Sequence, residues 1–184
     1  MDIFDQKQVL STFEILVDSR EQNTERARKR YDSFGVPYKE KVTLSYGDYA
    51  CNAVLPNGTP IYDISGTIDP FCVVERKMNL DELAGCYTRS RERFKREFER
   101  AMDNNCRVYL ICENSTWENL LNGKYRSKLN SNAFMASAMA WMIRYNMNVI
   151  FCKEETSGKL IKEILYRDLK ERLEKGEFDY GLEL

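Results

Sequence analysis

The sequence predicts an α/β fold, with a mixed central β-sheet flanked by helices on both faces. Short apolar runs rich in valine and isoleucine alternate with longer segments in which apolar residues recur at helical spacing. In the stretch 38–77, several strand-like runs also follow one another, separated by turn residues rather than by helices. This order of elements is typical of a sheet that combines parallel and antiparallel strands under a cover of helices.

In the first part of the chain, local chemistry marks the boundaries of the elements. The apolar run at 13–18 is the first expected strand. The segment 23–35 is expected to be a helix with a solvated basic face, because Asn23 can cap it, an acidic residue follows in its first turn and a glycine ends it. Further strands are expected at 38–44, 48–55, 59–65 and 71–77, with turns at 56–58 and 65–70.

Helical periodicity dominates after residue 77, interrupted by two apolar runs that fit buried strands. The expected elements are one broken or two successive helices over 80–87 and 90–105, a strand at 107–113, a short helix and polar loop over 117–130, a helix at 131–146, a strand at 148–153 and a closing helix at 157–176 capped by Ser157. No repeat, low-complexity segment or linker is visible, so one domain over residues 1–184 is expected.

Composition narrows the class of protein. The 28 basic and 29 acidic residues give a net charge of -1, so any surface that binds a polyanion has to be local. No apolar run approaches the roughly 20 residues needed to span a bilayer, and the N-terminus lacks the pattern of a signal peptide. The six scattered cysteines form no CxxC pair, which indicates reduced thiols. We therefore expect a cytoplasmic protein without membrane contact.

The sequence contains no histidine, and this absence excludes several classes of catalytic mechanism. Serine and cysteine nucleophiles that depend on a histidine base are excluded, and so is most zinc chemistry. A catalytic site in this chain has to use Asp, Glu, Lys, Arg, Tyr or Cys side chains.

Four carboxylates lie at the ends of expected strands or just beyond them: Asp18, Asp48, Glu75 and Asp81. In α/β proteins, ligands bind in the crevice beside strand ends. Oxygen ligands without histidine or cysteine favour Mg²⁺ or Mn²⁺, and such an ion can hold a water nucleophile and neutralise charge on a phosphodiester. This is a chemistry for nucleic-acid hydrolysis that needs no histidine.

The Glu-Arg-Lys triplet adds a cation to this group. Because side chains alternate along a strand, Glu75 and Lys77 share one face and Arg76 points the other way. A lysine beside the metal can orient the water or stabilise the transition state. The plainer alternatives are a solvated strand end for the triplet and turn chemistry for the aspartates.

Three motifs occur in order along the chain: LVDSRE at 16–21, SYGDYA at 45–50 and VVERKMNLDEL at 73–83. Together they resemble the nuclease domain of the XPF family of structure-specific endonucleases, which carries V-D-x-R-E, G-D-Y and E-R-K-x-x-x-D. The resemblance covers residues 13–155, and the compact chain is similar to stand-alone members from bacteria and their phages. It implies a restriction-endonuclease-like core, Mg²⁺-dependent cleavage of DNA and, often, dimerisation through the nuclease domain.

By position in these motifs, the resemblance implies roles for eight residues. These are Asp18, Asp48 and Glu75 as acidic metal-site residues, Lys77 as the catalytic lysine, Arg76 and Asp81 as supporting residues, and Arg20 and Glu21 as partners of the metal-site residues. Mg²⁺ is the implied cofactor, with Mn²⁺ able to substitute. Larger family members carry tandem helix-hairpin-helix modules or a helicase, and neither occurs in these 184 residues.

Two basic segments offer local surfaces for DNA. At helical spacing, one side of the segment 89–102 carries Arg89, Arg93, Arg96 and Arg100, and the opposite side carries Phe94, Phe98, Ala101 and Met102, which are expected to face a core. The second segment is the loop around Lys124 and Arg126. The alternatives are a solvated helix face laced by ion pairs and a plain surface loop.

The helix expected at 131–145 is apolar nearly all round and is therefore expected to be buried, either inside the domain or at a dimer face. The sequence as a whole predicts a divalent-metal-dependent DNA endonuclease that favours flap, fork or branched DNA. A homodimer or a partner protein would then supply sharper structural discrimination. The alternatives are a catalytically inactive nuclease-fold module that binds DNA or serves as a scaffold, and a nuclease that acts on RNA.

Overall fold

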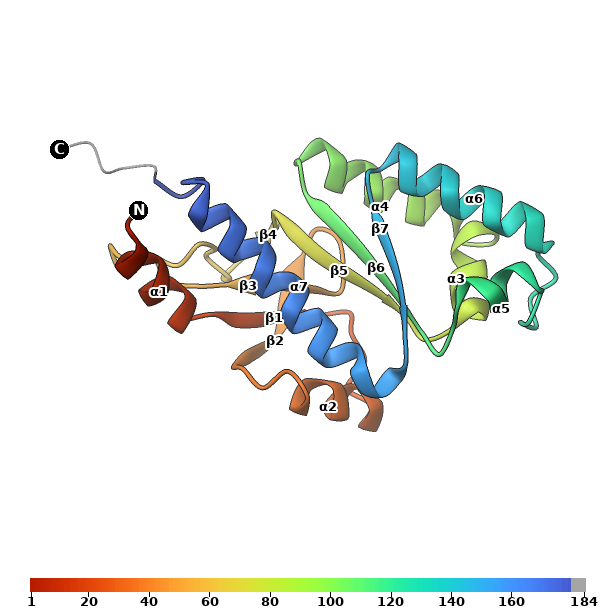
Figure 1. Ribbon diagram of the computed structural model, residues 1–184, viewed down its shortest axis with the longest axis horizontal. Coiled ribbons are helices and arrows are strands. Elements are labelled where there is room, and N and C mark those ends of the chain that lie inside the picture. The colour runs from red at the N-terminus through yellow and green to blue at the C-terminus, as the bar shows by residue number, and fades with distance from the viewer. Residues whose placement is uncertain (180–184) are drawn as a thin grey trace.

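A computed structural model describes residues 1–179 of the chain. One seven-stranded sheet has the strand order β4-β2-β1-β3-β5-β6-β7 (Figure 1). The elements are, in chain order, α1 (Ile3–Ser11), β1 (Glu14–Asp18), α2 (Glu25–Asp32), β2 (Tyr38–Leu44), β3 (Tyr49–Asn52), β4 (Thr67–Ile68), β5 (Cys72–Lys77), α3 (Leu80–Tyr87), α4 (Arg91–Asp103), β6 (Arg107–Glu113), α5 (Trp117–Leu121), α6 (Ser131–Arg144), β7 (Asn148–Cys152) and α7 (Glu154–Glu174).

The sheet is mixed, as the sequence predicts. Strand β3 runs antiparallel to both of its neighbours, β1 and β5. The pairs β1–β2, β2–β4, β5–β6 and β6–β7 are parallel. This arrangement brings the start of β3 beside the ends of β1 and β5: the backbone N–H of Asp18 donates to the carbonyl oxygen of Asp48 at 2.9 Å, and the N–H of Asp48 donates to that of Val74 at 2.9 Å.

Helices cover both faces of the sheet, which confirms the predicted α/β architecture (Figure 1). Helices α3, α4 and α6 enclose one core, which contains Val73 of β5 and Trp141 of α6. Helices α1, α2 and α7 enclose the other core, which contains Val74 of β5 and Leu165 of α7. Successive residues of β5 thus point into different cores, so both faces of this central strand are buried.

The strand prediction is wrong in one region. Residues 59–65 form no strand, and Val54 and Pro60 make only an isolated bridge. Proline cannot donate a backbone hydrogen bond to a ladder, which disfavours a strand there. The short strand β4 instead lies at Thr67–Ile68, within the expected turn, and pairs with the end of β2.

The helices differ from the prediction at three places: one helix was not predicted, and two others have a different capping residue or start. Helix α1, absent from the prediction, is capped by the side chain of Asp2. Helix α2 is capped by Thr24 rather than Asn23. Helix α7 begins at Glu154, so the expected cap Ser157 lies buried inside the first turn, where its hydroxyl donates to the Glu154 carbonyl oxygen at 2.9 Å. Several polar residues could serve as caps at each site, and packing decides which of them does.

The segment 80–105 forms two successive helices, one of the two arrangements expected. Because α4 begins at Arg91, Arg89 lies in the turn before it and not on the helix. Phe94 and Phe98 are buried as predicted, but Met102 is 46% exposed and does not face the core.

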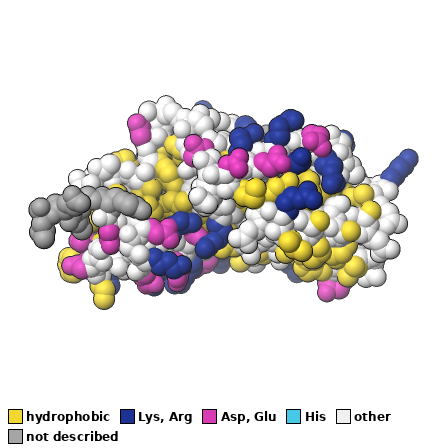
Figure 2. Space-filling model, turned by 90° about the horizontal axis from the view of Figure 1, so that it is seen from above, with side chains coloured by type: hydrophobic (Ala, Val, Ile, Leu, Met, Phe, Trp, Pro, Cys, Tyr) yellow, Lys and Arg dark blue, Asp and Glu magenta, His cyan; other side chains and the backbone are white. Residues whose placement is uncertain are grey.

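Within one copy of the chain, helix α6 is buried along one stripe only, so the fold of the single domain covers the helix in part. Phe134 and Trp141 are buried, whereas Met139 is 37% exposed and Ile143 is 84% exposed. Hydrophobic side chains gather on the surface at the end of the molecule where α6 lies (Figure 2). The sequence periodicity shows that the helix is apolar, but packing against α3 and α4 covers only one side of it.

None of the helices within residues 1–179 is both long and apolar enough to cross a bilayer. The six cysteines are free thiols, and all of them except Cys152 are buried.

Candidate active site

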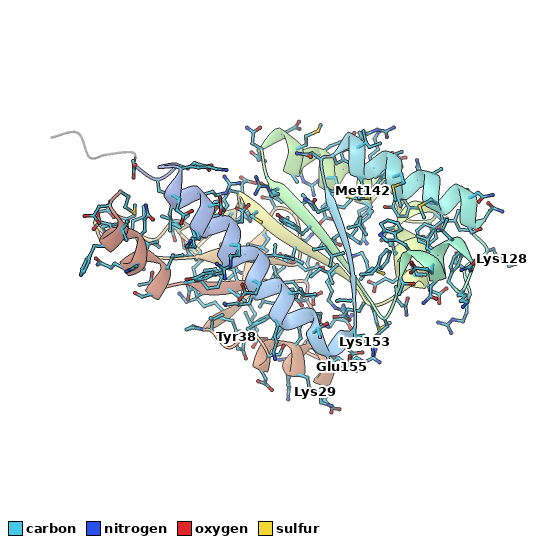
Figure 3. All side chains as sticks on the ribbon, in the orientation of Figure 1. Lys29, Tyr38, Lys128, Met142, Lys153 and Glu155 are labelled. Atoms are coloured by element: carbon cyan, nitrogen blue, oxygen red, sulfur yellow. The ribbon has the colours of Figure 1, made fainter. Side chains whose placement is uncertain are left out.

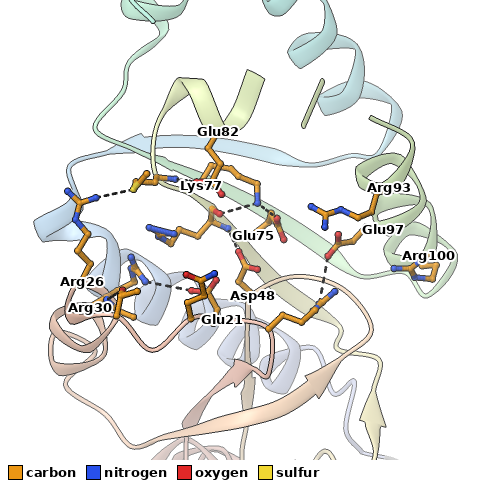
Figure 4. Close-up of a pocket in the computed structure, with 16 residues that line it drawn as sticks. Glu21, Arg26, Arg30, Asp48, Glu75, Lys77, Glu82, Arg93, Glu97 and Arg100 are labelled. Atoms are coloured by element: carbon orange, nitrogen blue, oxygen red, sulfur yellow. Dashed lines mark hydrogen bonds and ion pairs between the residues drawn. The ribbon is translucent and has the colours of Figure 1, made fainter. Parts of the chain in front are cut away.

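A polar cavity of about 630 Å³ opens where β1 and β5 end and β3 begins (Figure 4). Six residues predicted from the motifs line it. Asp48, Glu75 and Lys77 are the predicted metal-site and catalytic residues among them, and the other three are Arg20, Glu21 and Arg76. One wall comes from the loop after β1 and the start of α2, and the opposite wall comes from α4. The structure therefore brings together the three residues that would form the chemical centre of the predicted site.

A tight turn before β3 places Asp48. Gly47 has a φ of +76°, and a Cβ on it would lie 2.6 Å from the Cβ of Val73, so both the conformation and the space require glycine. The Asp48 Oδ2 accepts the backbone N–H of Arg76 at 2.7 Å. The turn thus holds the Asp48 carboxylate against the last residues of β5.

Glu75 and Lys77 share one face of β5, as the alternation of the strand predicts. The Lys77 ammonium donates to Oε1 of Glu75 and, at 3.2 Å, to the carbonyl oxygen of Arg76. The other carboxylate oxygen of Glu75, Oε2, is buried without a hydrogen-bond partner among the described residues. The Lys77 Nζ also lies 5.4 Å from the centre of the Phe94 ring, so an aromatic side chain of α4 packs over the lysine.

The electrostatics of the cavity favour a bound cation. Burial and the charge of Glu75 raise the pKa of Asp48 well above its ordinary value. Burial likewise raises the pKa of Glu75, against the lowering effect of Lys77. For Lys77, burial alone would lower the pKa, but the two carboxylates outweigh it and raise the pKa. The ionised carboxylates are therefore held at an electrostatic cost that a divalent cation would relieve.

Asp48 and Glu75 fit a hard divalent ion by the chemistry of their donors. Both offer carboxylate oxygens, and Oε2 of Glu75 has no partner in the described part of the chain. Mg²⁺ is commonly held by one or two carboxylates, with waters and substrate phosphates completing its shell. Within residues 1–179, no group of three or more His, Cys, Asp or Glu side chains is arranged to hold a metal. The pair therefore suits an ion whose shell is completed by substrate and water.

Asp18, the third expected metal-site residue, lies outside the cavity lining. It is buried at the end of β1, where Oδ1 accepts the backbone N–H of Arg20 at 2.8 Å and its Nε at 2.5 Å. Oδ2 accepts the N–H of Leu44 at 2.9 Å. The Nη2 of Arg20 then donates to the carbonyl oxygen of Gly47 at 3.3 Å. In this position Asp18 orients Arg20 toward the turn that carries Asp48.

The Arg76 side chain points to the opposite face of β5, as predicted, and forms an ion pair with a buried glutamate. Its Nη2 lies 3.1 Å from Oε2 of Glu113, which is fully buried at the end of β6. Arg30 of α2 donates to Oε1 of Glu113 at 3.2 Å and to the hydroxyl of Tyr49 at 2.9 Å. Tyr49 in turn donates at 2.8 Å to Glu21, which lines the cavity. This chain of contacts joins α2, β3, β5 and β6 beneath the site.

Sequence reasoning missed Glu113 and misplaced Arg30. Arg30 was expected on a solvated helix face but is only 4% exposed, because it pairs with the buried Glu113. A usable signal for Glu113 was present: it ends the apolar run of β6, just as Glu75 and Lys77 end that of β5. No local signal marks Arg30, because its partner lies 83 positions away.

Asp81 also lies outside the main cavity. Its Oδ1 accepts the backbone N–H groups of Arg126 at 2.7 Å and Ser127 at 2.8 Å, and its Oδ2 accepts the Nε of Arg126 at 3.2 Å. Burial alone would raise the pKa of Asp81, but these hydrogen bonds lower it. Asp81, Arg89 and Arg126 line a second hollow of about 390 Å³.

The sequence matches the ERCC4 domain over residues 17–164, from β1 into α7. The chain belongs to the ERCC4 domain family. Among solved structures, it is similar to "XPF from Aeropyrum pernix", with a TM-score of 0.57 and 18% sequence identity over 84% of this chain and 61% of that chain. It is similar, too, to "XPF from Aeropyrum pernix, complex with DNA", with a TM-score of 0.56 and 19% identity over 86% of this chain and 65% of that chain. A comparison with curated protein sequences finds no match.

These comparisons confirm that the ERCC4 domain described here has an XPF-type nuclease fold with a restriction-endonuclease-like α/β core. The chain spans 61% and 65% of the length of the two XPF chains that it resembles. What is shared is therefore the fold of this domain, and any activity of the whole XPF chains extends to this chain only as a proposal.

Four of the six predicted DNA-binding residues of this ERCC4 domain line one of two hollows. Arg93 and Arg100 of α4 line the main cavity (Figure 4). Arg89 and Arg126 line the second hollow instead. The two remaining residues, Arg96 and Lys124, are exposed and line neither hollow.

Proposed function

We propose that this ERCC4 domain is a divalent-metal-dependent endonuclease that hydrolyses phosphodiester bonds in DNA. The observation that carries the proposal is the meeting of Asp48, Glu75 and Lys77 in one cavity, beside Arg93 and Arg100 of α4. Carboxylates, a lysine and flanking arginines are the side chains that phosphodiester hydrolysis needs when no histidine is present.

Asp48 and Glu75 are the residues that would hold Mg²⁺, with Mn²⁺ able to substitute. When bound, the ion would supply a water nucleophile and neutralise charge on the phosphate. Lys77 acts as a hydrogen-bond donor, because the neighbouring carboxylates raise its pKa and keep it protonated at neutral pH. Two of its three N–H groups are directed at Glu75 and at the Arg76 carbonyl oxygen, which leaves one for the attacking water or a phosphate oxygen.

The arginines beside the cavity are proposed to follow the phosphate backbone of the DNA. Such contacts position a nucleic acid but carry no sequence information, so we propose cutting that is independent of sequence. Junctions and flaps bend into a crevice more readily than intact duplex, which supports a preference for flap, fork or branched DNA. One of the two similar XPF structures is a complex with DNA, in keeping with DNA as the substrate class.

We further propose a homodimer that uses the outer face of α6 and the neighbouring sheet edge. Met139 and Ile143 are exposed on α6, and β7 is the last strand of the sheet. An exposed apolar patch and an unpaired strand edge are surfaces that proteins normally cover. The second copy, or a partner protein on the same face, would then supply the sharper discrimination between branched DNA and plain duplex.

The decisive experiment compares initial cleavage rates on labelled flap, fork and duplex DNA of identical sequence, with Mg²⁺, with Mn²⁺, with Ca²⁺ and with EDTA. We expect cutting with Mg²⁺ or Mn²⁺ only, faster on the flap and fork than on the duplex, and unchanged when the sequence is scrambled. A matched RNA substrate tests the RNA alternative. DNA binding without cutting under any metal would establish the inactive binding module instead.

A further inference from the structure

The loop 122–130, between α5 and α6, contains only turns and bends, yet one side chain from another element fixes its middle. Asp81, in the first turn of α3, accepts the backbone N–H groups of both Arg126 and Ser127 and also the Nε of Arg126. Both oxygens of this carboxylate are therefore occupied by the loop. The contact depends on the tertiary fold, because Arg126 lies 45 positions after Asp81.

A second contact holds the loop from the inside. The hydroxyl of Tyr125 donates to the carbonyl oxygen of Leu129 at 2.7 Å, and its ring packs edge-on against Phe134, with ring centroids 5.4 Å apart. The basic side chains are left outside. Lys124 and Lys128 are exposed, and the Arg126 side chain is 90% exposed.

The chemistry of this loop suits a phosphate group. It presents three cations and has no acidic residue of its own. Because Asp81 takes the Nε of Arg126, both terminal nitrogens of that guanidinium remain available to a ligand. Arg89 lies across the same hollow, with its guanidinium packed against Gly85, where a Cβ would lie 3.5 Å from Nε. Two arginines thus line one hollow, and paired guanidinium groups are well suited to phosphate oxygens.

The connection to the catalytic strand is short. Strand β5 carries Glu75 and ends at Lys77, and α3 starts at Leu80. Asp81 therefore links the loop to the helix that directly follows the catalytic strand, while lying outside the cavity of Asp48 and Glu75.

We propose that Asp81 is a positioning residue that holds the loop 122–130 beside Arg89. The loop and Arg89 then form a second phosphate-binding surface, which binds DNA away from the bond that is cut. This inference rests on the proposed function, because DNA is taken as the ligand. It assigns the last residue of the E-R-K-x-x-x-D motif in this chain to substrate binding rather than to the metal or the chemical step.

The test separates substrate binding from chemistry. Asp81→Ala is measured for cleavage with Mg²⁺ over a range of flap-DNA concentrations, and for DNA binding in EDTA by fluorescence anisotropy at several salt concentrations. We expect KM and Kd to rise about tenfold, the salt slope of binding to fall by about one to two units, and kcat to stay within about twofold. Asp81→Asn should recover most of the affinity, because its remaining oxygen can still accept the two backbone N–H groups of the loop.

A third readout follows the loop itself and needs no activity. Trypsin should cut after Lys124, Arg126 or Lys128 faster in Asp81→Ala than in the wild type. Glu155→Ala is the matched control: it removes an exposed carboxylate that lies far from Lys128 (Figure 3), and it should change none of these measurements. If Asp81→Ala does not fold, Arg126→Gln, which leaves Asp81 in place, should show the same losses of affinity and salt slope.

Two outcomes would overturn the inference. One is loss of kcat in both Asp81→Ala and Asp81→Asn with unchanged DNA binding in EDTA, which would return Asp81 to the metal or the chemical step. The other is unchanged binding together with unchanged trypsin cleavage. Failure of the wild-type protein to bind or cut DNA would refute the proposed function, and the trypsin comparison would still report whether Asp81 holds the loop.

Discussion

The backbone N–H of Arg76 donates to Oδ2 of Asp48 at 2.7 Å, while the side chain of the same Arg76 reaches Glu113 at 3.1 Å on the other face of the sheet. Arg76 thus joins the carboxylate at the start of β3 to a fully buried carboxylate at the end of β6. A residue whose side chain lies on the other face of β5 from Glu75 and Lys77 therefore still helps to fix the position of Asp48.

Asp48→Asn is expected to abolish cleavage and to raise the melting temperature measured in EDTA. The amide can keep the hydrogen bond from Arg76, but it removes a charge that burial and Glu75 disfavour. Each kcal/mol recovered should raise the melting temperature by about 2–4 °C. Asp103→Asn, at an exposed carboxylate of α4, is the matched control and should change neither property. A melting temperature below that of the wild type would contradict this account of the cavity.

The metal-free protein is expected to lose stability as the pH rises. The folded-state pKa values of Asp48 and Glu75 are raised above their ordinary values of 3.8 and 4.5, so the folded protein binds more protons than the unfolded chain between the two sets of values. Stability should therefore fall as the pH passes through the raised values. Thermal melts in EDTA and in Mg²⁺ measure this, and the ion should stabilise the protein more at pH 8 than at pH 5.5. An equal effect of Mg²⁺ at both values would argue against a carboxylate site.

Replacing Lys77 should remove both activity and stability. Lys77→Met abolishes cleavage and leaves Glu75 as an unpaired buried charge, which costs about 3–5 kcal/mol. The double variant Lys77→Met with Glu75→Gln should regain most of that stability without regaining cleavage. Chemical denaturation of the wild type and the two variants measures the difference. Full activity in Lys77→Met would show that the lysine takes no part in the reaction.

Arg93→Gln combined with Arg100→Gln should weaken DNA binding and lower its salt slope by about two units, since each phosphate contact contributes roughly one. The matched control is the single variant Arg167→Gln on α7, whose side chain is 65% exposed. Binding in EDTA isolates the effect from cleavage. An unchanged slope would mean that these arginines form an ordinary solvated face.

Ile143→Glu should convert the proposed dimer to a monomer. A charge on the exposed outer face of α6 would have to be buried in the interface, whereas Ile3→Glu, at another exposed isoleucine on α1, should leave assembly unchanged. Light scattering at micromolar concentration would show the mass falling from twice the chain mass to the chain mass of 21.7 kDa. A wild-type mass equal to that of one chain would refute the dimer.

The sequence by itself determined the α/β class and the positions of Asp48, Glu75 and Lys77 relative to their strands. The two-residue alternation of a strand places Glu75 and Lys77 on one face of β5. The turn at Gly47 places Asp48 directly before β3. These are local properties of the chain, so periodicity and turn chemistry are enough to predict them.

Only the tertiary structure decided where the other carboxylates are directed. A position near a strand end does not specify the partner of a side chain. Asp18 accepts a hydrogen bond from the backbone N–H of Leu44, 26 positions away, and Asp81 accepts one from that of Arg126, 45 positions away. The exposed side of α6 has the same cause, because an apolar sequence cannot say which neighbours will cover it. The carboxylates of Asp18 and Asp81 are satisfied by hydrogen bonds from distant segments, and these segments come together only once the chain has folded.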